Sequence, residues 1–174
     1  MRLLICAGGT GGGVYPALSA VQASESRPAD LLWVGSEHGM DAELVRQTAV
    51  DGGMIPFTTI PAAGLHGVGL RSLPRNLVQL GRGALAARQR LSEFRPGVML
   101  FTGGYLAAPV ALVGWRIPSL LYVPDIEPGL ALKFLARFAT CIAVTTEESQ
   151  NYFPARTRTV VTGYPTRAEF DRWD

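Results

Sequence analysis

The chain has 174 residues, of which 48% are hydrophobic and 17% are charged, and sixteen basic against fourteen acidic residues give a net charge of +2. This composition is typical of one globular domain and excludes a disordered chain. The near balance of charge argues against a nucleic-acid partner. Cys6 and Cys141 both lie in apolar runs, which predicts buried thiols of a reducing, cytoplasmic compartment, with no disulfide and no metal site.

Apolar runs of strand length alternate along the chain with segments of helical composition. In chain order, strands are expected at 3–6, 31–34, 55–60, 98–101, 119–123, 141–144 and 159–162, and helices at 15–24, 41–50, 72–94, 107–115, 130–139 and 147–152. Several of the strand runs lack a two-residue alternation, as expected where helices cover both faces of a sheet. The pattern therefore predicts an α/β fold, a doubly wound, Rossmann-like parallel sheet. No apolar run is long enough to span a membrane, so any membrane contact is expected to be peripheral.

A glycine-rich loop connects the first predicted strand to the first predicted helix. Glycines let the backbone approach a ligand closely, and the start of a helix offers unpaired N–H groups and a partial positive charge. The loop therefore predicts a binding site for a phosphate-type anion, and a tight turn without a ligand is the alternative. Its candidate binding residues are Gly8, Gly9, Thr10, Gly11, Gly12 and Gly13, with Tyr15 just behind them.

Two common nucleotide motifs fail on spacing. A dinucleotide fingerprint that begins at Gly9 needs glycine at position 14, where the chain has Val14. A P-loop that begins at Gly8 needs Lys and Ser or Thr where the chain has Val14 and Tyr15. A nicotinamide-dependent oxidoreductase is disfavoured for the same reason, and Glu37 is only a weak candidate for a ribose-binding acid.

A second glycine turn follows the predicted strand at 98–101. Its residues are Thr102, Gly103, Gly104 and Tyr105. Because the carboxyl ends of parallel strands meet at one edge of a sheet, both glycine turns are expected to face one crevice. A diphosphate or a sugar that contacts bare backbone would explain both, and an ordinary turn into a helix is the alternative for the second turn.

Taken together, the ordered motifs resemble the acceptor half of the MurG-like glycosyltransferases. The resemblance covers essentially the whole chain and rests on the two glycine turns, Pro16-Ala17, the run 39–45, Gly64-Leu65-His66-Gly67, the run 133–136 and Gly163-Tyr164-Pro165-Thr166-Arg167. It implies a two-domain enzyme that transfers N-acetylglucosamine from a UDP-sugar to a lipid-linked diphosphate acceptor in peptidoglycan synthesis. Residues 1–162 would be the N-terminal acceptor-binding domain and 163–174 the hinge and the start of a donor-binding domain. Alone, this half is expected to be inactive and to need no cofactor.

Two family positions differ in this chain. The family has histidine after its Gly-Gly-Thr-Gly-Gly run, where this chain has Gly13. The family's His-Glu-Gln-Asn motif falls on the run from Tyr122 to Asp125. A related transferase that acts on another lipid or glycoside, or a non-catalytic membrane-associated binding module, therefore stays open.

Asp125 and Glu127 follow the predicted strand at 119–123 and are the best-placed carboxylates. An inverting transfer needs a base for the acceptor hydroxyl. Asp125 is the hypothesis for that base and Glu127 for an acceptor contact, while a helix cap is the alternative role for an acid at this place.

Leucines at helical spacing, with arginines among them, are candidates for a patch that binds an anionic membrane surface at the cytoplasmic face. The resemblance supports this interpretation, and a core-facing leucine stripe with a solvated basic side is the alternative. The patch comprises Leu70, Arg71, Leu73, Arg75, Leu77, Leu80, Arg82 and Trp115.

Overall fold

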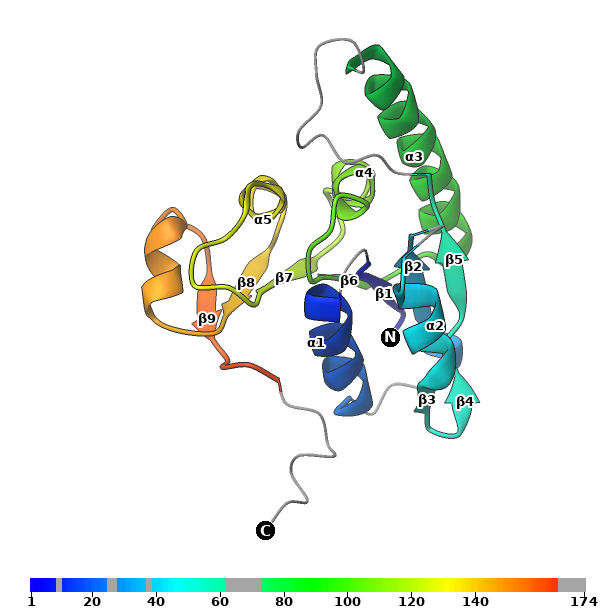
Figure 1. The fold of residues 1–174 in the computed structure, drawn as a ribbon, viewed down its shortest axis with the longest axis horizontal. Helices are drawn as coiled ribbons and strands as arrows, with labels where there is room; N and C mark the ends of the chain where they lie inside the picture. The colour runs from blue at the N-terminus through cyan, green and yellow to red at the C-terminus, as the bar shows by residue number, and fades with distance from the viewer. Residues whose placement is uncertain (9–10, 25–27, 37–38, 62–72, 166–174) are drawn as a thin grey trace.

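A parallel sheet of seven strands forms the centre of the molecule (Figure 1). The computed structural model describes residues 1–8, 11–24, 28–36, 39–61 and 73–165. The strand order is β5-β2-β1-β6-β7-β8-β9, and each neighbouring pair is parallel. The predicted doubly wound parallel sheet is thereby confirmed. The strands are β1 (Leu3–Cys6), β2 (Leu31–Gly35), β5 (Phe57–Thr59), β6 (Val98–Phe101), β7 (Ser119–Val123), β8 (Cys141–Val144) and β9 (Thr159–Val161).

Helices cover both faces of the sheet, so its central strands are buried on both sides. Leu4 and Cys6 of β1 belong to one core cluster, which also receives Leu91 from a long helix, while Ile5 belongs to a second cluster with Val14. Figure 1 shows α1 and α2 on one side and α4 and α5 on the other. The helices are α1 (Gly11–Gln22), α2 (Asp41–Gln47), α3 (Leu73–Phe94), α4 (Ala107–Val113) and α5 (Leu130–Leu135), with short 3-10 turns η1 (Pro28–Asp30) and η3 (Glu148–Tyr152).

Several boundaries differ from the sequence prediction. The helix α1 begins at Gly11, four residues before the predicted start, so Pro16 lies inside the helix. The helix α2 ends at Gln47, where a helix to residue 50 was predicted, because the chain turns there into the hairpin β3 (Ala49–Val50) and β4 (Gly53–Met54). Asp51 and Gly52 form its turn, with positive φ angles of 48° and 75°. Asp-Gly is a favourable pair for such a two-residue turn.

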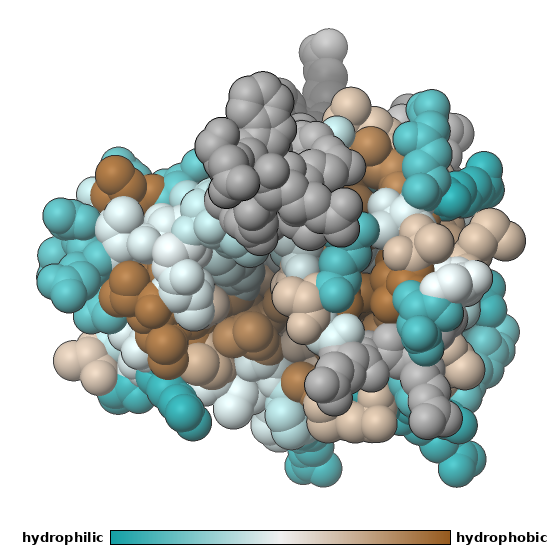
Figure 2. Space-filling view, turned by 90° about the horizontal axis from the view of Figure 1, so that it is seen from below, coloured by the Kyte–Doolittle hydropathy of each residue, from teal (hydrophilic) through white to brown (hydrophobic). Residues whose placement is uncertain are grey.

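The β9 edge of the sheet carries apolar surface outward. Val160 and Val161 are both exposed on this edge strand. Viewed from below, hydrophobic residues appear on the side of the molecule where β9 lies, and also near the middle and on the opposite side (Figure 2). The apolar side chains of β9 are therefore exposed to solvent, whereas those of the central strands β1, β6 and β7 are mostly buried.

Candidate functional site

A cavity of about 520 Å³ opens at the carboxyl ends of β1, β6 and β7, which are neighbours in the sheet. The first and the second glycine turn line it together, as does the segment after β7. In doubly wound sheets this is the edge where ligands bind. Of the residues predicted from the sequence, the lining includes Gly8, Gly12, Gly13, Thr102, Gly103, Gly104, Tyr105 and Asp125.

The first turn brings the backbone of β1 and the start of α1 to the cavity. Gly8 is buried, and a Cβ atom there would lie 2.6 Å from Leu106 Cδ2 and 2.9 Å from Asp41 Oδ2. The first residues of α1 contribute Gly12 and Gly13 to the lining. Because the first N–H groups of a helix have no partner within it, they are available to an anion.

Four further residues of this loop were predicted to bind the ligand. Gly9 and Thr10 lie outside the described residues. Gly11 and Tyr15 belong to α1 but do not line the cavity. The Tyr15 ring covers Gly11, where a Cβ atom would lie 3.1 Å from Tyr15 Cε2. Tyr15, which was predicted to bind the acceptor, therefore lies on α1 outside the cavity lining.

The second turn packs directly on the first. Gly103 and Gly104 have φ angles of +116° and +87°, a backbone region that other residues rarely adopt. A Cβ atom at Gly104 would lie 2.8 Å from the carbonyl oxygen of Gly8. Glycine at position 104 is therefore required twice, by its backbone angle and by the close approach of the two turns.

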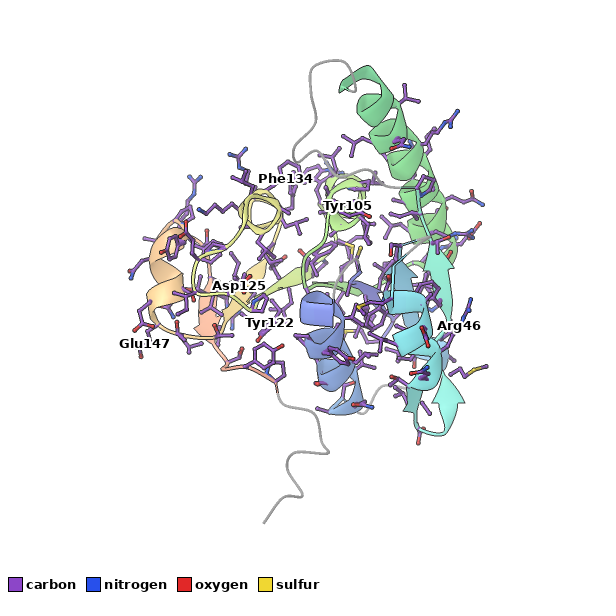
Figure 3. All side chains as sticks on the ribbon, in the orientation of Figure 1. Arg46, Tyr105, Tyr122, Asp125, Phe134 and Glu147 are labelled. Carbon is purple, nitrogen blue, oxygen red and sulfur yellow. The ribbon has the colours of Figure 1, made fainter. Side chains whose placement is uncertain are left out.

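The segment after β7 forms the opposite wall. Asp125 lines the cavity with an exposed side chain (Figure 3). Glu127 is outside the lining, and its carboxylate pairs with Lys133 Nζ at 3.5 Å on the surface. Of the two predicted carboxylates, the structure therefore brings only Asp125 to the glycine turns.

Tyr122 and Tyr164 add a part of the site that the sequence prediction missed. The Tyr122 hydroxyl donates a hydrogen bond to the carbonyl of Gly163 at 3.4 Å, and the ring meets the edge of Tyr164 at 6.4 Å between centres. Burial, followed by the neighbouring Tyr164 and Asp125, raises the pKa of Tyr122 far above its usual value. The hydroxyl therefore stays protonated and joins β7 to the segment that carries Tyr164 into the cavity wall.

Asp41 supports the first glycine turn from behind. It begins α2 and is fully buried, and its carboxylate accepts hydrogen bonds of 2.6 Å from both the backbone N–H and the hydroxyl of Ser36. Side chains at Gly35 or Gly39 would overlap this carboxylate. Burial and, second, Asp41 raise the pKa of the Cys6 thiol far above its usual range. The sequence placed Asp41 in a family motif but gave no sign of this position.

Comparison with known proteins decides the family. The model described as the glycosyltransferase family 28 N-terminal domain matches residues 3–144. The chain belongs to that family. A UDP-N-acetylglucosamine–N-acetylmuramyl-(pentapeptide) pyrophosphoryl-undecaprenol N-acetylglucosamine transferase of Desulforudis audaxviator is 42% identical over 97% of this chain and 45% of its own length. The relative of the same name from Moorella thermoacetica is 35% identical, over 100% of this chain and 47% of its own length.

Solved structures show the same fold. MurG of Acinetobacter baumannii matches with a TM-score of 0.70 and 22% identity, over 92% of this chain and 44% of that one. The UDP-GlcNAc 2-epimerase of Methanocaldococcus jannaschii matches with a TM-score of 0.66 and 14% identity, over 94% and 46%. The predicted resemblance to the MurG-like transferases is confirmed, and this family 28 domain spans about half the length of the curated relatives that it matches.

The predicted membrane patch of this family 28 domain is only partly described. Trp115, after α4, is 58% exposed, and the guanidinium of Arg116 lies 4.7 Å from the centre of its ring. On α3, Arg82 is exposed and Leu80 is half-buried. No helix among the described residues has the length and apolarity to cross a membrane. Leu70 and Arg71 lie outside the described residues, as do the side chains of Leu73, Arg75 and Leu77.

Cys141 corrects one sequence expectation. Cys6 is buried as predicted, but Cys141 is partly exposed because it begins β8 near the surface. Within the described parts of the chain, no three His, Cys, Asp or Glu side chains gather in a way that could hold a metal ion.

Proposed function

We propose that this chain is the acceptor-binding half of a transferase that moves N-acetylglucosamine from a UDP-sugar to a lipid-linked diphosphate in peptidoglycan synthesis. The names of the relatives support this activity. The observation that carries the proposal is the contact of two glycine turns over one cavity, at Gly104 and Gly8. Residues 1–162 are the acceptor domain, and residues from Gly163 onward lead to the donor domain that binds the UDP-sugar. Without that domain, the chain transfers no sugar.

Backbone amides hold the acceptor diphosphate in this proposal. The described lining of the cavity has no lysine or arginine and includes Asp125, so an anion would be attracted by the start of α1 and by the N–H groups of the turns. Such hydrogen bonds to a charged group contribute about 1.5–3 kcal/mol each. A few of them are enough to hold a diphosphate at the mouth of the sheet.

Binding of inorganic pyrophosphate to the 174-residue chain, measured by titration calorimetry, tests this cradle. Gly104→Ala places a Cβ atom 2.8 Å from the Gly8 carbonyl at a positive φ angle, so binding is expected to weaken by more than about tenfold. Gly81→Ala is the matched control, because a Cβ atom there meets nothing within 4 Å. Equal affinity of both variants for pyrophosphate contradicts the proposed cradle.

Asp125 is the proposed base for the acceptor hydroxyl, because Gly13 offers no side chain for that task. In a transferase made by joining this chain to the donor domain of a curated relative, Asp125→Asn is expected to lower kcat by about 10²–10⁴-fold with little change in the acceptor KM. Glu127→Gln is the control, because Glu127 pairs with Lys133 outside the cavity. An unchanged kcat in Asp125→Asn rejects this role.

The proposed location is the cytoplasmic face of the membrane, to which the exposed Trp115, Arg116 and Arg82 bind peripherally. Each arginine near an anionic surface contributes about 1 kcal/mol. In a vesicle flotation assay the chain is therefore expected to float with vesicles that contain phosphatidylglycerol and not with vesicles of pure phosphatidylcholine. Trp115→Ala and Arg82→Ala should weaken that association, and equal binding to both vesicle types argues against the patch.

A further inference from the structure

The hydroxyl of Thr102 is buried without a hydrogen-bond partner. Thr102 follows β6, is 3% exposed, and its Oγ1 is the buried side-chain polar atom that has no partner among the described residues. Buried polar groups are nearly always paired by hydrogen bonds. A buried hydroxyl without a partner destabilises the fold, whereas valine, which has the same shape, would not. The position of this hydroxyl therefore needs an explanation outside the core packing.

The unpaired hydroxyl of Thr102 is buried beside Gly13, at the start of α1. Both residues line the cavity. A Cβ atom at Gly13 would lie 3.3 Å from the Thr102 carbonyl oxygen and 3.5 Å from Oγ1. Gly13 is in the first turn of α1, where alanine would favour the helix, and its backbone has no left-handed angle that requires glycine. Glycine at position 13 therefore keeps the side of the hydroxyl free of a side chain.

We propose that Thr102 is a binding residue whose hydroxyl donates a hydrogen bond to a phosphate oxygen of the bound acceptor headgroup. This inference rests on the proposed function and assigns one side-chain contact among the backbone contacts of the cradle. Because Oγ1 itself is buried beside Gly13, its contact with the headgroup requires the start of α1 to shift away from the turn after β6. Thr102 thereby fixes the headgroup between the start of α1 and the positive-φ turn at Gly103.

Two variants of Thr102 test the contact in the 174-residue chain. Thr102→Val is expected to weaken pyrophosphate binding by about tenfold or more, while the thermal midpoint without pyrophosphate stays equal or rises, since an unpaired hydroxyl has been removed. Thr102→Ser keeps the hydroxyl and should bind within about threefold of the parent chain. Unchanged binding by Thr102→Val overturns the proposal. A lower midpoint of that variant without pyrophosphate also overturns it, because the hydroxyl then has an internal partner.

A double-mutant cycle with Gly13 gives a second, independent measurement. Gly13→Ala covers the hydroxyl with a methyl group and should weaken binding in the parent chain, although alanine favours the helix. In the Thr102→Val background the same change should have little further effect, because the contact is already lost. Fully additive losses overturn the coupling of the two residues.

Different sources of the phosphate are separated by a parallel titration with farnesyl diphosphate and UDP. Tighter binding of farnesyl diphosphate than of UDP, with the loss in Thr102→Val shared by pyrophosphate and farnesyl diphosphate, supports the lipid-linked acceptor. Tighter binding of UDP overturns that assignment. If the parent chain binds none of the three, the proposed cradle fails together with this inference. If Gly104→Ala lowers binding and Thr102→Val does not, only this inference fails.

Discussion

Two glycines of α3, Gly81 and Gly83, predict opposite effects of one substitution. Both are inside the helix, where replacing glycine by alanine gains about 0.5–1 kcal/mol of stability from backbone entropy and helix propensity. A Cβ atom at Gly81 meets nothing within 4 Å, so Gly81→Ala should keep this gain. Gly83 is buried, and a Cβ atom there would overlap the carbonyl oxygen of Pro61 and lie 3.4 Å from Pro109 Cγ.

The clash at Gly83 outweighs the gain in helix propensity. Relief of the overlap with Pro61 requires α3 and the chain after β5 to separate by roughly 1 Å, up to ordinary van der Waals distance. Overpacking of this kind costs about 1–3 kcal/mol. After the propensity gain, Gly83→Ala should lose about 1–2 kcal/mol. In a domain of this size each kcal/mol corresponds to about 2–4 °C, so the two variants should differ in Tm by about 3–12 °C.

Urea denaturation followed by circular dichroism at 222 nm measures both free energies of unfolding. Equal m-values for the parent chain, Gly81→Ala and Gly83→Ala establish that the unfolded states are comparable. If Gly83→Ala is as stable as Gly81→Ala, the packing of α3 against Pro61 is refuted. If Gly81→Ala is also destabilised, the open environment at that position is refuted.

Further predictions concern the residues behind the first glycine turn. Asp41→Ala leaves two donors of Ser36 without an acceptor and should cost about 3 kcal/mol or more in urea denaturation, while the exposed Glu43→Ala on the same helix should stay within about 0.5 kcal/mol. A small effect of Asp41→Ala would show that this carboxylate does not hold the turn. Iodoacetamide at pH 8 should alkylate the partly exposed Cys141 before the buried Cys6, and in urea both should react alike, as peptide mass spectrometry can report. Because the folded pKa of Cys6 lies above its unfolded value, its contribution to stability is present at neutral pH and should decline as the pH rises above about 8.5. Equal alkylation of Cys6 and Cys141 in the native chain would contradict the burial of Cys6.

The central strands follow from the sequence because their apolar runs are sharply bounded. The boundaries of β1, β6, β7 and β8 agree with the prediction to the residue. Helix propensity mispredicts a boundary where tertiary packing determines it. Gly11, Gly12 and Gly13 are poor helix formers, yet they begin α1 because its later turns pack on the sheet. The predicted end of α5 at residue 139 was wrong for a similar reason, since the chain leaves the helix at Leu135 to reach β8.

Part of the candidate site could likewise be predicted from the sequence, and part could not. Topology alone predicts that the turns after β1 and β6 share one sheet edge, because parallel strands point the same way. Contacts between distant parts of the chain were missed, namely Tyr122 with Gly163 and Asp41 behind Gly8. No local pattern distinguishes a buried carboxylate such as Asp41 from an ordinary first-turn acid of a helix.

The contact between the two glycine turns has a consequence for how such a domain can change. Because Gly104 sits against the Gly8 carbonyl, a side chain gained at position 104 displaces the turn after β1 as well. Natural variants should therefore alter these two stretches together or not at all, although more than ninety residues separate them in the chain. Under the proposed function, new acceptor preferences would then arise at the exposed Tyr164 in the opposite wall of the cavity.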